Sequence, residues 1–79
     1  MNTVDNQYST KDAEKAELLY ASGQVINSYN WVGNTCYFQF NDKEGCTNIL
    51  TQDLKGELTL NSRSYLEGRR TIRSILRSR

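Results

Sequence analysis

The chain contains no histidine among its 79 residues. Histidine is the most common general base near neutral pH and the most common metal ligand, so its absence argues against the usual catalytic and metal sites. There are two cysteines, Cys36 and Cys46, and a tetrahedral zinc site needs four ligands. No glycine-rich phosphate loop, nucleophile elbow or calcium-binding loop is found in the sequence. We therefore predict a protein that is not an enzyme and that holds no metal or cofactor.

Long apolar runs are also missing. No run approaches the 18 or so residues that a membrane span requires. Residues 1–7 have neither the basic start nor the apolar centre of a signal peptide. These features predict a cytoplasmic protein with no membrane partner. Two cysteines are too few for a disulfide framework, so we expect Cys36 and Cys46 to be reduced thiols that fill small packing positions.

Positive charge is scarce outside one segment. Six of the ten basic residues lie in residues 61–79, where Glu67 is the one acid, which gives this segment a charge of +5. Residues 1–60 carry four lysines and eight acids, a charge of −4, so the total is +1. The basic residues of the segment are all arginine: Arg63, Arg69, Arg70, Arg73, Arg77 and Arg79. A basic face on a mildly acidic body suits a single oriented contact.

The period of residues 61–79 predicts an amphipathic helix. At about 100° per residue, Tyr65, Ile72 and Leu76 fall on one line. A second face gathers four of the arginines within about 80°: Arg63, Arg70, Arg73 and Arg77. Ser64 and Glu67 have the spacing of a capping box at the helix start, with Asn61 or Ser62 as earlier caps.

The remainder of the chain predicts one helix and several strands. Residues 1–8 have no period that would bury them and are expected to form a flexible arm, followed by a single domain over residues 9–79. Residues 11–21 are good helix formers that follow Ser9 and Thr10 and end before Gly23. In this helix we expect Ala13, Ala16, Leu19 and Tyr20 to be buried and Glu14 and Glu17 to be solvated.

Glycines at intervals of 10 to 12 residues separate strand-like segments. Residues 35–41 show the clearest alternation, with Cys36, Phe38 and Phe40 on one face and Tyr37 on the other. The predicted strands are residues 24–32, 35–41, 46–51 and, as a short fourth strand, 57–60. Gly33 marks the first reversal, and residues 42–45 the second. The predicted fold is α+β: a two-layer sandwich of a helix, a three- or four-stranded antiparallel meander and a C-terminal basic amphipathic helix.

This predicted order of helix, strands and helix resembles that of double-stranded-RNA-binding domains, which implies RNA as a partner by analogy of topology. That family concentrates lysines at the start of its second helix, where this chain has Ser62, Ser64, Tyr65 and Glu67. The chain is therefore not assigned to the family.

The arginines provide the strongest functional hypothesis. A guanidinium group binds carboxylate or phosphate through a planar fork, and lysine would keep a surface equally soluble, so the exclusive use of arginine is informative. We predict a small regulator or inhibitor that docks onto an acidic surface of another protein through Arg63, Arg69, Arg70, Arg73 and Arg77. A nucleic-acid-processing enzyme is a natural partner, and phage or mobile-element proteins that block host defence are one class of this kind.

Two other interpretations stay open. The same arginines could contact the phosphates of DNA or RNA, or they could form a solvated face. Tyr37 adds a second candidate surface, which Tyr29 and Trp31 would join if their strand has the opposite register.

Overall fold

A short strand and a capped helix open the computed structural model, which describes residues 6–78. Strand β1 (Tyr8–Thr10) is followed by helix α1 (Ala13–Ala21). The predicted flexible arm falls mostly on residues 1–5, which lie outside the described residues, but its last residue, Tyr8, is already paired with Phe40 of a neighbouring strand. Asp12 is the N-cap of α1, because its Oδ1 accepts hydrogen bonds from two backbone amides of the first turn. The helix predicted over residues 11–21 is therefore present, but it begins two residues later, at Ala13.

The next two strands form a hairpin. Strand β2 (Ile26–Val32) pairs antiparallel with β3 (Thr35–Phe40), and Gly33 takes a φ of 62° in the two-residue turn, as a tight hairpin requires. β1 pairs with the other side of β3, which gives a three-stranded antiparallel sheet in the order β1-β3-β2. The sheet is thus not a meander of consecutive strands, because its third strand comes from before α1 and not from after β3.

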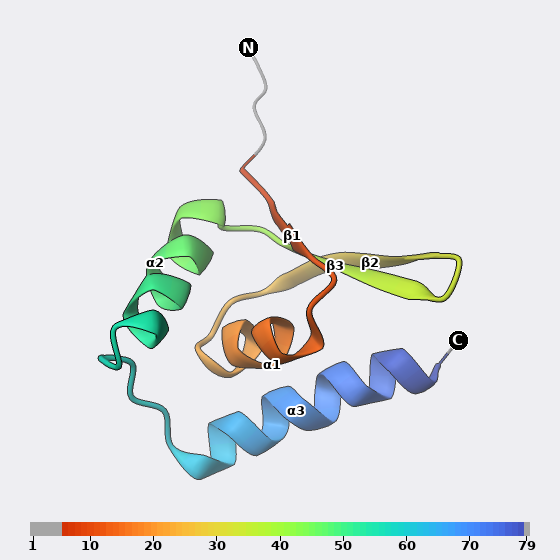
Figure 1. Ribbon diagram of the computed structural model, residues 1–79. Coiled ribbons are helices and arrows are strands. Elements are labelled where there is room, and N and C mark those ends of the chain that lie inside the picture. Colours follow the sequence, from red (N-terminus) through yellow and green to blue (C-terminus); the bar gives the residue numbers. More distant parts are fainter. Residues whose placement is uncertain (1–5, 79) are drawn as a thin grey trace.

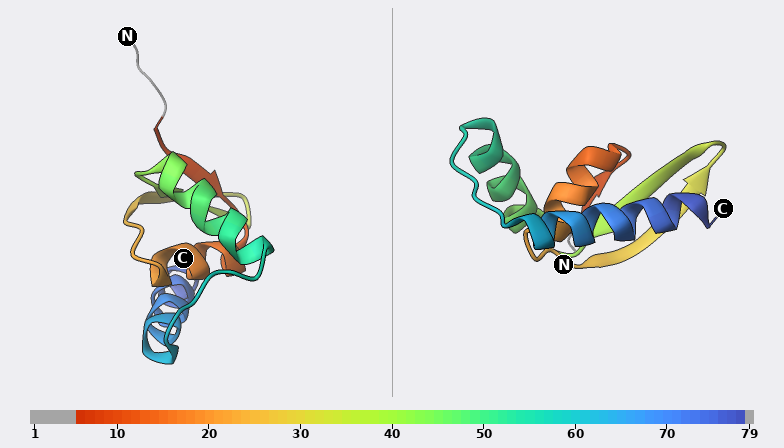
Figure 2. Two further views of the ribbon diagram at one scale, coloured as in Figure 1. Left: turned by 90° about the vertical axis from the view of Figure 1, so that its left-hand side faces the viewer. Right: turned by 90° about the horizontal axis from the view of Figure 1, so that it is seen from below.

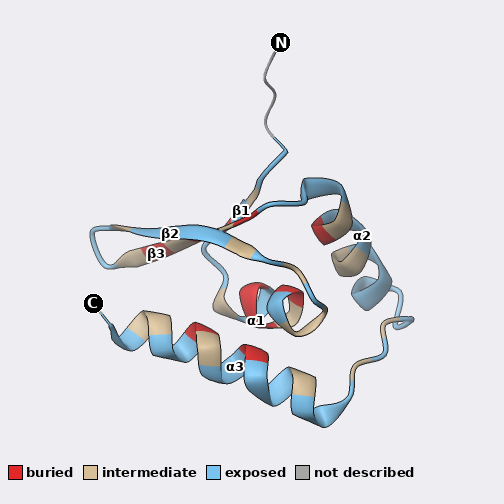
Figure 3. Ribbon diagram, turned by 180° about the vertical axis from the view of Figure 1, so that it is seen from behind, coloured by how far each residue is buried: buried red, intermediate tan, exposed pale blue. Residues whose placement is uncertain are grey.

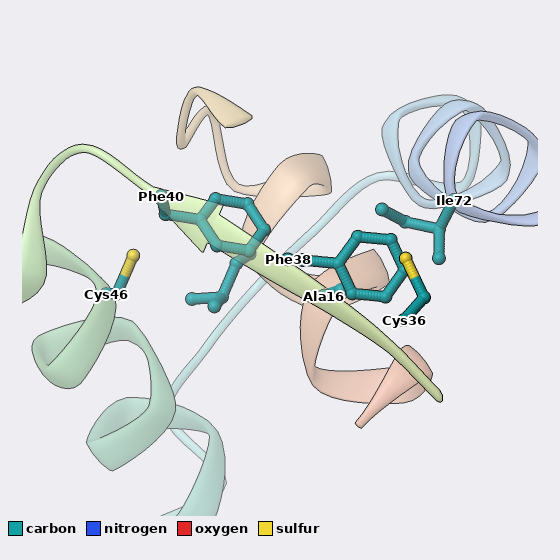
Figure 4. Packing of buried hydrophobic residues seen from close by; sticks show 7 residues of the cluster. Ala16, Cys36, Phe38, Phe40, Cys46 and Ile72 are labelled. Atoms are coloured by element: carbon teal, nitrogen blue, oxygen red, sulfur yellow. The ribbon is translucent and has the colours of Figure 1, made fainter. Parts of the chain in front are cut away.

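Strand β3 is the centre of the core, as its alternation predicts. Cys36 is 4% exposed, and Phe38 and Phe40 are fully buried, while Tyr37 lies on the opposite face of the sheet. In Figure 4 the two phenylalanine rings lie between Cys46 at one end and Ile72 at the other. Seven residues form this buried hydrophobic cluster: Ala16, Leu19, Cys36, Phe38, Phe40, Cys46 and Ile72.

The predicted third strand is a helix. Residues 43–54 form α2 (Lys43–Leu54), and Asp42 is its N-cap, with Oδ1 accepting from Gly45 N at 2.9 Å. Residues 42–45 are therefore a helix start and not a strand reversal. Cys46, Ile49 and Leu50, spaced by three and four residues, pack onto the core from one side of this helix. The predicted fourth strand is also absent: residues 57–60 are irregular, with Leu58 and Leu60 half-buried.

The last element is helix α3 (Ser62–Arg77). Asn61 is its N-cap, with Oδ1 accepting from Ser64 N at 2.8 Å. The predicted capping box of Ser64 and Glu67 was therefore wrong, because Ser64 lies inside the first turn, and the alternative cap Asn61 is the one used. Ile72 is fully buried, and Ile75 and Leu76 pack against the core. Tyr65, which shares their line on the helix, is 42% exposed.

The three helices lie on the side of the sheet that carries Phe38, and each contributes side chains to the core. In Figure 1, α1 lies between the sheet and α3, and α2 stands beside α1 at the end away from the hairpin. Figure 2 shows α3 crossing α1, with α2 and the hairpin extending to either side. The molecule measures 36 × 32 × 17 Å. The mixed α+β class, the three-stranded antiparallel sheet and the packing of the C-terminal helix on the sheet are confirmed.

The element order β-α-β-β-α-α differs from the helix, three strands and helix predicted from the sequence, so the topological resemblance to double-stranded-RNA-binding domains is lost. Within residues 6–78, no helix is both long and apolar enough to cross a membrane.

Candidate docking surface on the C-terminal helix

Helix α3 is held at a fixed angle by a close approach to α1. Gly68 is buried where the two helices meet, and a Cβ atom placed on it would lie 2.6 Å from the backbone oxygen of Glu17. The same atom would lie 3.1 Å from the backbone nitrogen of Ala21 and 3.2 Å from its Cβ. Glycine is therefore required for this contact. The crossing also sets which face of α3 remains exposed, and Figure 3 shows buried positions on the side of α3 toward α1 and exposed ones on the other.

An ion pair joins the same two helices. The Glu17 side chain is only 6% exposed, and its Oε2 lies 3.7 Å from Nε of Arg73, whose side chain is 53% exposed. The prediction that Glu17 is solvated was therefore wrong. Helix α1 is covered by the sheet on one side and by α3 on another. More of its surface is therefore buried than in a helix that packs through a single face, and the buried part includes Glu17. A buried carboxylate needs a charge partner, so Arg73 belongs partly to the fold.

The other arginines of α3 are exposed, and three of them form a straight row. Arg63, Arg70 and Arg77 are seven residues apart, so they fall within about 40° of one another on the helix and are spaced by about 10.5 Å along its axis. We call these three residues the arginine row. Among residues 6–78, the one arginine with an acidic partner within 4 Å is Arg73. No member of the row forms such a pair, although Glu67 lies four residues after Arg63 and three before Arg70 on the same helix.

A shallow hollow follows the same side of the helix. It has a volume of about 290 Å³ and is lined by Leu66 together with Arg69, Arg70, Arg73 and Arg77. Leu66 is 53% exposed. The sequence analysis did not single out Leu66, although its position on the helix, three residues before Arg69 and four before Arg70, places it among the arginines. The surface therefore combines charge with one apolar contact.

The arginines divide into two groups by their surroundings. Arg69 and Arg73 also border a groove of about 390 Å³ between α1 and α3, where Glu14 and Glu17 stand on the opposite wall. Arg70 and Arg77 do not line that groove. Arg70 and Arg77 thus face away from Glu14 and Glu17, and Glu67 is the one acid on α3, beside the row.

The other candidate residues lie elsewhere. Arg63 is exposed on α3 but does not line the hollow, and Arg79 lies outside the described residues. Tyr37 is half-buried on the sheet face away from the helices. Its strand neighbours Tyr29 and Trp31 pair with Phe38 and Cys36, so they point to the helix-covered side of the sheet. The structure therefore does not form the aromatic face considered for Tyr37.

A second, larger hollow of about 530 Å³ lies between α1 and α2. Leu18, Leu50 and Leu54 contribute apolar surface to it, and Asp12 stands at its edge. The Asp12 carboxylate already accepts two backbone hydrogen bonds as the cap of α1. Glu14, Lys15 and Asp53 also line this hollow, so its charge is of mixed sign, whereas the charged residues of the hollow on α3 are all arginines.

The two thiols are buried and free. Burial raises the pKa of the Cys36 thiol, and burial together with the Asp42 carboxylate raises the pKa of the Cys46 thiol to about 11. Both cysteines are therefore neutral packing residues near pH 7, as predicted, and not nucleophiles. Within the described part of the chain, no group of three or more histidine, cysteine or acidic side chains is placed to hold a metal ion.

Comparisons with models of known protein families, with curated proteins and with solved structures gave no match.

Proposed function

We propose that the protein is a small regulator or inhibitor without enzymatic activity that docks onto an acidic surface of another protein through the outer face of α3. The observation that supports this proposal is the arginine row, whose three members are exposed, evenly spaced and without acidic partners among residues 6–78. Gly68 and the Glu17–Arg73 pair fix the helix that carries the row, so little order has to be gained on binding.

The spacing of the row suggests the shape of the partner surface. Residues seven apart on one helix face match residues seven apart on a second helix that lies along it, as in the charge pairing of helical bundles. A partner helix with acidic residues at that interval could form a bidentate contact with each arginine. Leu66 would supply an apolar contact beside the charged ones. A nucleic-acid-processing enzyme remains our proposed partner class.

The matched experiment reverses two charges of the row. Arg70→Glu/Arg77→Glu leaves Arg73 in place beside Glu17, so the α1–α3 contact is preserved. Binding to a panel of purified candidate partners in a pull-down is expected for the wild type and is expected to be lost for this variant. The control is Lys11→Glu/Lys43→Glu, which makes the same charge change at exposed residues beside the starts of α1 and α2, where acids are tolerated. Unchanged partner binding by the folded row variant would refute the proposal.

The competing hypothesis is that the row binds nucleic-acid phosphates. On duplex DNA, three such contacts would make log affinity fall with log salt at a slope of roughly −2.7, at about −0.9 per contact. An anisotropy titration with duplex and single-stranded DNA and RNA at about 50 and about 200 mM salt measures that slope. If nucleic acid binds with that slope, and Arg70→Glu weakens all sequences alike, the phosphate-binding function replaces protein docking. If no nucleic acid binds at micromolar protein concentration in the low-salt buffer, the phosphate-binding hypothesis is excluded.

A further inference from the structure

Glu17 is a buried carboxylate that the fold satisfies only in part. Its side chain is 6% exposed, and its charged partner is Arg73, whose Nε lies 3.7 Å from Oε2. That separation is longer than a hydrogen bond, and within the described part of the chain no donor forms a hydrogen bond with this carboxylate. A carboxylate has about four lone-pair sites, and in buried groups donors normally occupy them. Glu17 therefore has acceptor positions open to a donor from outside the chain.

The groove of about 390 Å³ between α1 and α3 is where such a donor can reach Glu17, which is one of its lining residues. Glu14, three residues earlier on α1, is exposed on the same wall, and Arg69 is exposed on the wall formed by α3. Among residues 6–78, neither Glu14 nor Arg69 has a charged partner within 4 Å. The volume lies within the range of roughly 300–1,000 Å³ that small-molecule sites occupy. The groove thus presents acceptors on one wall and guanidinium donors on the other.

The same groove also has apolar surface. Tyr65, which is 42% exposed, and the half-buried Leu76 line it from α3, and the half-buried Ala13 lines it from α1. Tyr65 belongs to the apolar line of α3, but the core does not cover its ring. An aromatic ring in this position offers a face to the apolar part of a ligand.

We propose that this groove binds a small zwitterion with one ammonium group, one carboxylate group and an apolar body, as in a free apolar amino acid. The ammonium group donates to Glu17 and Glu14, the carboxylate accepts from Arg69, and the apolar body lies against Tyr65. The charge of the groove selects this class, because its two acids and two arginines sum to zero. A simple cation would meet the arginines and a simple anion the glutamates, whereas a zwitterion complements both walls. The arginine row does not line this groove, so the site is separate from the proposed docking surface.

Blocked derivatives of one amino acid test the two charges separately. L-Phenylalanine is titrated into isotope-labelled protein and followed by NMR chemical shifts, and we expect a dissociation constant of about 1 mM or lower. N-acetyl-phenylalanine lacks the ammonium group and phenylalanine amide lacks the carboxylate. Each should bind about tenfold or more weakly, because the lost group leaves Glu17 or Arg69 without its hydrogen bonds. Phenylalanyl-glycine carries the same two charges further apart, so the tighter of the two zwitterions identifies an amino acid or a peptide as the ligand.

Two variants assign each charge to its wall. Arg69→Gln should weaken phenylalanine binding about tenfold and remove its advantage over the amide, and Glu17→Gln should remove its advantage over the N-acetyl derivative. Arg69 is exposed, so its variant stays folded even if the buried Glu17→Gln does not, and circular dichroism establishes the fold of each. The control is Lys55→Gln, which removes the same charge at the exposed C-cap of α2 and should leave binding unchanged.

Two results would overturn the proposal. If neither phenylalanine nor phenylalanyl-glycine binds at concentrations on the order of 10 mM, water alone satisfies Glu17 and the groove is not a ligand site. Binding that the blocked derivatives match, or that Arg69→Gln does not weaken, would show that the two charged walls do not select the ligand.

Discussion

The contact between α1 and α3 can be tested by adding a single methyl group. In Gly68→Ala, the new Cβ would lie 2.6 Å from the backbone oxygen of Glu17, closer than such atoms approach in real structures. The obstacle is backbone and not the end of a flexible side chain, so α1 and α3 must move apart. That movement loosens the packing of Ile72, which is fully buried beside the sheet.

Two opposing effects set the magnitude. Alanine is favoured over glycine in a helix interior by about 1 kcal/mol. Overpacking a close contact costs typically about 1–3 kcal/mol, and a backbone clash belongs at the upper end of that range. We expect a net loss of about 2 kcal/mol in the free energy of unfolding, which for a domain of this size lowers the melting temperature by roughly 8–16 °C.

Thermal and urea unfolding followed by circular dichroism measure this change. Ser74→Ala is the control, because Ser74 is exposed on the same helix and the substitution raises helix propensity without entering the α1–α3 contact. It should leave the melting temperature equal to or slightly above that of the wild type. If Gly68→Ala also melts at or above the wild-type temperature, the two helices do not approach as closely as described.

Two further predictions concern the core. Phe40→Ala empties a fully buried position and should cost about 3–5 kcal/mol, enough to unfold a domain of this size. Tyr37→Ala, on the other face, should leave it folded, and the reverse ranking in thermal melts would contradict the assigned faces. Because the pKa of Cys46 is raised in the folded protein, the unfolded chain loses this thiol proton at a lower pH than the folded protein does. The protonated thiol of Cys46 therefore stabilises the fold fully below about pH 9, and this stabilisation is lost as the pH rises to about 11. Between about pH 8 and about pH 10.5 the urea midpoint should therefore fall further for the wild type than for Cys46→Ala, and equal falls would disprove this assignment.

The parts of the fold that were predictable are those where local pattern and tertiary environment agree. In β3, apolar and more polar residues alternate with a period of two, a pattern that is typical of a strand with one buried face. Gly33 marks a reversal because the hairpin turn needs a positive φ there. The C-terminal helix has the strongest amphipathic period in the chain, so its position and its exposed arginines follow from residue spacing alone.

Helix α2 was predicted to be a strand because the residues at its start are compatible with either a turn or a helix N-terminus. Asp42 can open a turn or cap a helix, since its side chain accepts a backbone hydrogen bond in both. Ile49 and Leu50 are adjacent, so in a strand they would point to opposite faces and could not both be buried on one of them. With Cys46 they have the spacing of one face of a helix. Strand β1 could not be found in the sequence because three residues carry no period, and only pairing with β3 defines them.

The candidate site was predictable in its charge but not in its internal contacts. The helical period groups Arg63, Arg70, Arg73 and Arg77, and it does so without any knowledge of the rest of the molecule. Separating Arg73 from the others requires knowing that α1 packs against α3 and that Glu17 is buried between them. The sequence contains no local signal of that pairing, because more than fifty residues separate the two side chains.

The packing of α3 on α1 has a consequence for folding during synthesis. Residues 22–61 separate the two helices, and at about 5–20 residues per second α3 begins to emerge roughly 2–8 s after α1 is complete. During that interval α1 and the hairpin can meet, but Glu17 has no Arg73 and the site that Ile72 fills stays empty. Chaperones and proteases would therefore encounter an incomplete core until α3 is made. A truncation before Gly68 would leave the nascent chain in that state permanently.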